Sequence, residues 1–373
     1  MTEERHIGYR PTWAEVDLDN LAHNFTQLKQ CLAPQVKMMV CVKADAYGHG
    51  ITQVANRLVS CAADYLGVAS IDEAVKLREA GIKLPILILG MIHHKDIEAL
   101  FDYKITPNIC SAELMHALDK QATAKNQLIG AHIKVDTGMG RLGILHKEAL
   151  EFIKKIHALK TVPIEGVFTH LACADTNKDF TLHQIKLFKR LLSQLKKENI
   201  PVPLAHVANS IGLIAYKESH FDMVRPGLAV YGLHPKEGLE INLKPALSLR
   251  TRVLYVKRVS AGHGISYGHT YVTKKKTTIV TLPIGYGDGY PRNLSNKAPV
   301  LIRGKRFKIC GNICMDQIMV DVGDCPVEIG DEVVLIGQQG ENKITAEELA
   351  GFSETIPYEI VCGLGNRIPR VYI

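Results

Sequence analysis

The stretch VCVKADAYGHG, from Val40 to Gly50, defines the first structural unit of this chain. The residues from Met38 to Val42 are continuously apolar, which is typical of a strand buried on both faces of a parallel sheet. Lys43 closes this run, and Gly48 and Gly50 favour a turn directly after it. Because buried strands rarely carry charge, a lysine at this point indicates a reactive group at the end of the strand.

The same alternation of short apolar runs and longer amphipathic segments continues from about residue 15 to residue 235, as in repeated βα units. Helical spacing is clearest at Ile185, Phe188, Leu192 and Leu195. The expected strands are Met38–Lys43, Tyr65–Ser70, Ile86–Gly90, Ile105–Cys110, Ala131–Asp136, Ile164–Leu171, Leu204–Asn209 and Met223–Tyr231. Other expected helices are Leu18–Leu32, Thr52–Ala62, Asp72–Ala80, Lys95–Tyr103, Ser111–Ala124, Lys147–Leu159 and Ile211–Tyr216.

Eight such strands predict an α/β fold with an N-terminal (β/α)8 barrel of the TIM type over residues 12–240, whose reactive groups lie at the C-terminal strand ends. A doubly wound open sheet would show the same alternation, so the strand count only favours the barrel.

After about residue 240 the pattern changes to period-two alternation with glycine-rich turns, which predicts a mainly β domain over residues 241–373. A short helix is expected to begin near Thr345, because Glu347 and Glu348 follow in its first turn. The expected strands are Leu247–Val259, Thr277–Leu282, Val300–Ile302, Phe307–Cys310, Ile318–Val322 and Glu332–Ile336. We expect residues 1–11 to pack on this domain.

The composition limits the possible partners and location. The formal charge of +7 is spread along the chain, and the run Lys274–Lys276 fits a solvated loop better than a nucleic-acid surface. The nine cysteines are scattered without a CxxC pair, as expected of reduced thiols. The N-terminus lacks the apolar core of a secretory signal and no membrane-length apolar run appears, so a cytoplasmic protein without membrane or nucleic-acid partners is expected.

Unusual polar residues follow several of the predicted barrel strands. They are Lys43, Asp136–Arg141, His170, Asn209–Ser210 and Arg225–Gly227. Taken singly they are weak signals, because a lone histidine after a strand is usually structural and a DTG triplet also occurs in aspartic proteases. The protease interpretation requires two such motifs, or a dimer, on an all-β scaffold, whereas this motif lies among βα units.

Their joint position indicates a phosphorylated ligand, because the last two barrel loops commonly bind phosphate. Ser210 can donate a hydroxyl there, while Gly212 and Gly227 let backbone N–H groups approach an anion. A lysine across the same barrel mouth then indicates pyridoxal 5'-phosphate (PLP), whose aldehyde condenses with an amine. No metal site is expected.

A series of motifs resembles those of bacterial alanine racemases, in the same order along the chain. They are VKADAYGHG, DTGMGRLG, FTHLACAD, HVANS, VRPGLAVYG, ISYGHTY, LPIGYGDGY, ICMDQ and the tail from Tyr358 to Arg370. The resemblance implies a fold-type III PLP-dependent isomerase that interconverts L-alanine and D-alanine and supplies D-alanine for peptidoglycan. It also implies a head-to-tail homodimer with active sites shared across the interface.

The resemblance further implies a role for each matching residue. Lys43 and the partner subunit's Tyr267 would be the two bases, because racemisation removes the α-proton from one face and returns it on the other. The cofactor-binding residues would be Lys43, Tyr47, His170, Asn209, Ser210, Arg225, Gly227, Leu228 and Tyr358. Arg141 and Met315 would bind the substrate, and Lys134, Tyr286, Arg292, Cys314 and Asp316 would support the site or line its channel.

Two of these residues carry additional expectations. Arg225 would face the pyridine nitrogen of the cofactor. Because an arginine cannot readily donate a proton to that nitrogen, the cofactor would withdraw electrons less strongly. Lys134 matches a lysine that is carbamylated in some members of the family. One position departs from the pattern, since many members carry arginine where Asn312 stands, and this leaves the electrostatics of substrate access open.

Three alternatives remain at this stage. A racemase for serine or for a broader set of amino acids shares the same motifs. A fold-type III decarboxylase shares the barrel and the lysine but would release CO₂. A barrel-only, non-catalytic PLP-binding protein would lack a β domain with an ISYG tyrosine, which this chain has.

Overall fold

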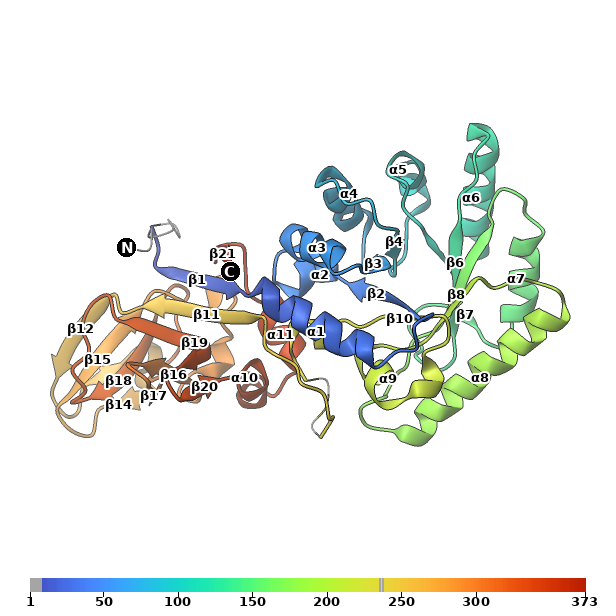
Figure 1. Ribbon diagram of the computed structural model, residues 1–373. Coiled ribbons are helices and arrows are strands. Elements are labelled where there is room, and N and C mark those ends of the chain that lie inside the picture. Colours follow the sequence, from blue (N-terminus) through green and yellow to red (C-terminus); the bar gives the residue numbers. More distant parts are fainter. Residues whose placement is uncertain (1–8, 235, 237) are drawn as a thin grey trace. The chain divides into compact units, whose positions relative to one another are not determined.

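The computed structural model describes residues 9–234, 236 and 238–373 (Figure 1). The chain forms two compact units, and each is described by itself. Among the described residues, the barrel unit contains 21–46 and 51–243, and the β unit contains 9–20, 47–50 and 244–373. For residues 1–8, the expected packing on the β domain lies outside the described residues.

Eight parallel strands form the barrel unit, as the sequence predicts (Figure 1). In spatial order they are β4 (Ile86–Ile88), β3 (Tyr65–Val68), β2 (Lys37–Cys41), β10 (Met223–Val224), β9 (Leu204–His206), β8 (Ile164–Phe168), β6 (Ala131–Asp136) and β5 (Asn108–Ile109). A parallel bridge between Leu87 and Thr106 joins β4 to the segment leading into β5, so the sheet closes. The alternative of an open doubly wound sheet is therefore wrong.

Most strands are shorter than predicted. The expected strand from Met223 to Tyr231 ends at Val224, because Pro226 lacks the N–H that would continue the ladder. Residues Leu228–Tyr231 instead form the short helix η3. An additional strand, β7 (Ile144–Leu145), pairs with β6.

The helices of the barrel lie close to the predicted positions: the first helix precedes the first barrel strand, and the others lie between strands. They are α1 (Leu18–Gln30), α3 (Ile51–Ser60), α4 (Ile71–Glu79), α5 (Ile97–Asp102), α6 (Ala112–Lys125), α7 (Ala149–His157), α8 (Lys178–Lys197) and α9 (Ser210–Ala215). In α8 the buried stripe includes Leu191, while the predicted Leu192 is only half-buried. Across the described ranges, no helix combines the length and the apolar character needed to cross a membrane.

The turn after Lys43, labelled α2 (Lys43–Tyr47), is left-handed. Its φ angles are 52° at Ala44, 51° at Asp45, 55° at Ala46 and 54° at Tyr47, so the turn begins before either glycine. This conformation costs an L-residue about 1–2 kcal/mol. Within the barrel unit, hydrogen bonds from Ala44 N to the Glu73 carboxylate and from Ile51 N to Asp45 offset part of that cost.

The β unit contains two main sheets and a small hairpin. The larger sheet comprises β1 (Thr12–Val16), β11 (Leu247–Arg252), β16 (Pro299–Ile302), β17 (Lys305–Lys308), β19 (Glu332–Gln339), β20 (Asn342–Ile344) and β21 (Arg370–Tyr372). The smaller sheet comprises β12 (Tyr255–Val259), β15 (Thr277–Leu282) and β18 (Ile318–Gly323), and the hairpin comprises β13 (Gly264–Ile265) and β14 (Tyr271–Val272). The single strand predicted over residues 247–259 is therefore wrong, because β11 and β12 belong to different sheets.

Two helices complete the β unit. Thr345 caps α10 (Ala346–Ser353) by accepting a hydrogen bond from Glu348 N at 3.1 Å, which confirms the predicted helix start. The sequence did not predict α11 (Pro357–Cys362), which has proline in its first turn.

Candidate active site

Cationic side chains gather at the C-terminal ends of the barrel strands. Lys43 follows β2, Lys134 lies on β6, Arg141 follows β6 and Arg225 follows β10. Lys134 is only 4% exposed, and burial together with the charges of Arg225, Arg141 and Lys43 lowers the pKa of Lys134 to about 8. A buried lysine whose pKa is lowered by neighbouring cations indicates an anion-binding site.

Arg225 is the buried centre of this cluster. Its guanidinium donates to the carbonyls of Thr169 at 2.7 Å and Val207 at 3.1 Å, and to His206 Nδ1 at 2.8 Å. Burial lowers the pKa of Arg225 to about 10, so the side chain stays charged at neutral pH. His170 Nδ1 lies 3.4 Å from the same guanidinium.

The hydrogen bonds of Arg225 fix the tautomers of the surrounding histidines. Arginine can only donate, so His206 accepts at Nδ1 and carries its proton on Nε2. His206 Nε2 then donates to His132 Nδ1 at 2.7 Å. Burial and the charge of Arg225 lower the pKa of all three histidines, to about 3 for His132 and well below the usual value for His206 and His170. All three rings are therefore neutral at physiological pH.

Asp136 shapes the loop that carries Arg141. Its carboxylate accepts hydrogen bonds from the backbone N–H groups of Gly138 at 2.8 Å, Met139 at 2.9 Å and Gly140 at 2.9 Å. A carboxylate engaged by three N–H groups is an anchor for the loop, not the free acid or base that an aspartic protease needs.

Gln184 joins two loops of the site, although the sequence analysis missed it. This fully buried side chain of α8 donates to Thr137 Oγ1 at 3.2 Å and to the His170 carbonyl at 3.0 Å. Its carbonyl accepts from Ala172 N at 2.9 Å. In the sequence, the only feature that could have indicated this role is the position of Gln184 among the apolar residues of the helix.

Ser210 and Gly227 lie together, as expected for a phosphate site. Ser210 Oγ accepts from Gly227 N at 3.0 Å and from Ala229 N at 3.3 Å, which leaves its hydroxyl hydrogen for donation. Asn209 caps α9 by accepting from Gly212 N at 2.9 Å, so this N–H is directed at Asn209. The neighbouring Leu228 is buried.

In the β unit, two tyrosines of the predicted cofactor set lie side by side. The ring centroids of Tyr47 and Tyr358 are 5.8 Å apart, with an angle of 41° between the ring planes. Tyr47 is buried and Tyr358 half-buried. Residues that are more than 300 positions apart in the sequence are thus brought into one aromatic contact.

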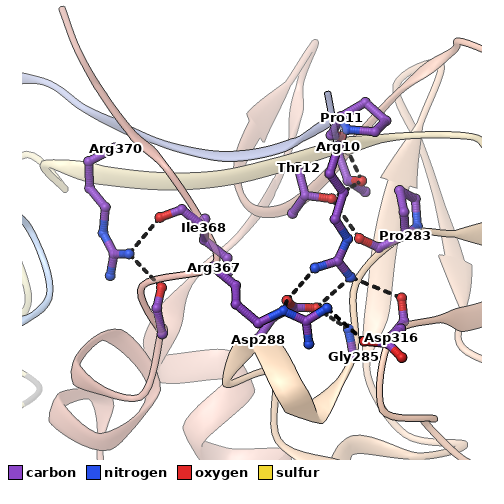
Figure 2. Close-up of polar contacts among 12 residues, drawn as sticks. Arg10, Pro11, Thr12, Pro283, Gly285, Asp288, Asp316, Arg367, Ile368 and Arg370 are labelled. Carbon is purple, nitrogen blue, oxygen red and sulfur yellow. Dashed lines mark hydrogen bonds and ion pairs between the residues drawn. The ribbon is translucent and has the colours of Figure 1, made fainter. Parts of the chain in front are cut away.

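A buried carboxylate, Asp288, joins several segments of the β unit (Figure 2). Asp288 is fully buried and forms a bidentate ion pair with Arg10, one bond of which is 2.7 Å long. It also accepts from Gly285 N at 2.8 Å, and Arg367 Nε lies 3.4 Å away. Arg10, Asp288 and Arg367 were not predicted, because their roles depend on contacts between distant segments.

This network places four of the predicted residues together. Tyr286 N donates to the Cys314 carbonyl at 3.0 Å, and Gly287 N donates to the Met315 carbonyl at 2.9 Å. Arg367 binds the Asp316 carboxylate at 2.7 Å, as Figure 2 shows. Met315 is 53% and Tyr286 42% exposed, so both side chains are presented at the surface of the β unit. Arg292 is exposed in the short helix η6 (Arg292–Leu294).

Tyr267 lies at the tip of the hairpin formed by β13 and β14. It begins the short helix η4 (Tyr267–His269), and its side chain is 73% exposed. The preceding Ser266 has φ 64° and ψ −175°, a region that is essentially restricted to glycine and costs about 1–3 kcal/mol. Directly after this turn, at the start of β14, the Tyr271 hydroxyl donates to Asp321 of β18 at 2.6 Å.

The predicted site residues thus form two sets, one in each unit. The barrel unit holds Lys43, Lys134, Arg141, His170, Asn209, Ser210, Arg225, Gly227 and Leu228. The β unit holds Tyr47, Tyr267, Tyr286, Arg292, Cys314, Met315, Asp316 and Tyr358.

Comparisons with known proteins indicate a single family. The models described as alanine racemase, N-terminal domain, and alanine racemase, C-terminal domain, match residues 16–235 and 246–372. The alanine racemase of Halothermothrix orenii is 49% identical over 367 residues, which cover 97% of each chain. The solved alanine racemase of Clostridium difficile 630 has a TM-score of 0.92 at 38% identity, over 97% of this chain and 96% of that chain.

A further solved structure concerns the cofactor. The alanine racemase from Bartonella henselae with covalently bound pyridoxal phosphate has a TM-score of 0.89 at 33% identity. The match covers 97% of this chain and 99% of that chain.

Proposed function

Since the chain belongs to the alanine racemase family, we propose that it interconverts L-alanine and D-alanine with PLP bound to Lys43. Lys43 and Tyr267 serve as the two bases. The proposed role is the supply of D-alanine for peptidoglycan.

The observation that carries this proposal is the cationic cluster at the C-terminal ends of β2, β6 and β10. Arg225 and Lys134 are buried without the solvent that normally stabilises charge, and Arg141 and Lys43 add to the positive potential. A phosphorylated cofactor and an amino-acid carboxylate supply the missing negative charge. The donor set therefore fits PLP.

The chain offers a residue for each part of this cofactor. Ser210 retains a hydroxyl hydrogen for a phosphate oxygen, next to the backbone of Gly227. Arg225 would bind at the pyridine nitrogen and the neutral His170 would contact the ring. The remaining cofactor contacts in the proposal are Tyr47, Asn209, Leu228 and Tyr358.

The two bases act on opposite faces of the substrate α-carbon. PLP, when bound, withdraws electrons from that carbon and so makes its proton removable. Lys43 exchanges the proton on one face, and Tyr267 exchanges it on the other. Arg141 and the Met315 N–H hold the substrate carboxylate, which keeps the α-carbon oriented between the two bases.

The proposal includes a homodimer in which each barrel uses the partner's Tyr267. The support is the 73% exposure of Tyr267 on a hairpin tip, which presents its hydroxyl outward from the β unit that carries it. Met315 and Tyr286 are presented in the same manner.

The first test is exchange of the α-hydrogen in heavy water, measured by mass spectrometry across amino acids. We expect rapid exchange and racemisation of both alanine enantiomers without loss of carbon. Release of CO₂ would favour a decarboxylase instead. Rapid exchange of serine without exchange of alanine would refute the assigned substrate.

The second test locates the cofactor. After borohydride reduction, the mass of PLP should appear on the peptide that contains Lys43 and be absent from Lys43→Ala. Lys37→Ala is the matched control, because Lys37 lies at the opposite end of the same strand. Labelling at another lysine would contradict the proposal.

The third test addresses sharing between subunits. Lys43→Ala and Tyr267→Phe should each be inactive, whereas a mixed dimer of the two should recover up to one working site. Tyr255→Phe changes another exposed tyrosine of the β unit and should remain active. Absence of rescue in verified mixed dimers would count against a shared site.

A further inference from the structure

We propose that Asn312 is a positioning residue for Tyr267, holding the catalytic turn by a hydrogen bond to its backbone. The inference rests on the proposed function, because it assumes that Tyr267 is one of the two bases. It assigns to Asn312 a role in the proton-transfer step rather than in substrate access.

The direct contact is short and specific. Asn312 Nδ2 donates to the Tyr267 carbonyl at 2.7 Å, and the Ser266 hydroxyl donates to the Asn312 carbonyl at 2.5 Å. The two segments are thus joined reciprocally, since each provides one donor and one acceptor. The pair encloses the peptide that connects Ser266 to Tyr267.

The turn needs such a clamp because its backbone is unfavourable. Ser266 has φ 64°, Gly268 has φ 72° and His269 has φ 46°. A residue in a sparsely populated region keeps its conformation only when its surroundings hold it. The hydrogen bonds at Ser266 and Tyr267 fall directly on the strained segment.

Packing and a second tether place Asn312 firmly enough to act as a clamp. A Cβ atom on Gly311 would lie 2.7 Å from the Ile265 carbonyl oxygen, so the two backbones are in close contact. Asn296 accepts from Gly311 N at 2.6 Å and donates to Thr270 Oγ1 at 3.0 Å. The segment before Asn312 is therefore also linked to the far end of the Tyr267 turn.

The proposed consequence concerns one of the two proton transfers. Without the clamp, the exposed Tyr267 turn can leave the orientation required for transfer, and the barrier of the Tyr267 step rises. Small displacements of a catalytic group reduce rates strongly. The Lys43 step belongs to the barrel unit and should keep its barrier.

The test uses Asn312→Ala and Asn312→Asp in the PLP-loaded enzyme. The second variant keeps the side-chain shape but turns an acceptor oxygen towards the Tyr267 carbonyl. We expect kcat to fall about tenfold in both variants, because one oriented hydrogen bond is lost. Asn342→Ala is the matched control, since Asn342 donates to the Gly304 carbonyl at 2.9 Å elsewhere in the β unit.

The deciding readout is the α-deuterium isotope effect on kcat/KM for each alanine enantiomer. The enantiomer whose exchange is lost in Tyr267→Phe identifies the Tyr267 step. In the Asn312 variants the isotope effect should rise for that enantiomer and fall for the other, because the Tyr267 step becomes more limiting in both directions. Isotope effects are ratios, so a smaller folded fraction does not change them.

Wild-type isotope effects and turnover in both Asn312 variants, with Tyr267→Phe inactive, would overturn the positioning role alone. The same would follow if Asn342→Ala shifted the isotope effects equally. Normal turnover in Tyr267→Phe would overturn the assigned base and the positioning role together.

Discussion

Asp288→Asn should destabilise the β unit strongly, although it changes a single atom of the side chain. The fully buried Asp288 carboxylate binds both terminal nitrogens of Arg10 and accepts from Gly285 N, with Arg367 at 3.4 Å. A hydrogen bond to a charged group contributes about 1.5–3 kcal/mol, and an arginine left without its buried partner adds a further penalty.

Solvent screening makes the ion pairs of Asp288 weaker than fully buried ones, because the side chains of Arg10 and Arg367 are 28% and 48% exposed. Asparagine also retains one acceptor for Gly285 N or Arg10. We therefore expect the free energy of unfolding to fall by about 3 kcal/mol.

Urea unfolding of the PLP-free protein, followed by tryptophan fluorescence, measures this change. Trp13 is the only tryptophan of the chain, and it lies buried on β1 of the β unit that contains Asp288. Asp324→Asn is the matched control, because its ion pair with Arg258 is 2.8 Å long but largely exposed and should contribute less than about 1 kcal/mol. A loss below about 1 kcal/mol for Asp288→Asn, or an equal loss in the control, would refute the reasoning.

The remaining predictions concern the turn after β2, the buried lysine and one glycine. Ala44→Gly should leave the free energy of unfolding unchanged or raise it by up to about 1 kcal/mol, because the backbone at Ala44 is left-handed. Ala117→Gly, in the right-handed helix α6, should instead lower it by about 1 kcal/mol. Urea unfolding followed by circular dichroism measures both changes. A loss at both positions would contradict this difference. Between pH 8 and pH 10.5, Lys134 binds more protons in the unfolded chain than in the folded chain. The free energy of unfolding of the wild type should therefore rise with pH across this window, relative to that of Lys134→Met. The measurement uses PLP-free protein in CO₂-free buffer. Parallel pH profiles would count against a depressed pKa. Gly48→Ala should lower the free energy of unfolding by at least about 3 kcal/mol, because a Cβ atom there would lie 2.2 Å from a carbonyl oxygen of α11. Gly340→Ala should cost about 1 kcal/mol, because no described atom lies within 4 Å of its Cβ position. Thermal or urea unfolding measures both losses. Similar losses for the two glycines would show that the close contact is unimportant.

Much of the barrel could be predicted because its strands are buried on both faces and therefore read as continuous apolar runs. The exact strand ends could not be predicted, since they depend on which backbone groups find a neighbour. Strand β1 illustrates the limit. Its five residues pair with β11, more than 200 positions later in the sequence, and local composition carries no information about such a partner.

The same distinction separates the predicted from the missed site residues. Lys43 and Arg225 stand out because they are charges next to apolar strands, and their chemistry is visible locally. Gln184, His206 and Asp288 act by binding groups on other segments, and each is an ordinary residue in its own stretch of sequence. Residues that orient others therefore emerge only when the fold has brought their partners together.

The sequence and the structure suggest different roles for Asn312. From the resemblance noted in the sequence, an arginine is expected here, and the neutral Asn312 implies weaker attraction of an anionic substrate. In the folded β unit the shorter side chain reaches the Tyr267 carbonyl at 2.7 Å and joins a reciprocal pair with Ser266. A long-range charge changes substrate encounter in a salt-dependent manner, whereas a backbone clamp changes the proton-transfer step at any salt concentration. Since the contact distance is short and the turn is strained, the contacts favour the clamp as the role of Asn312.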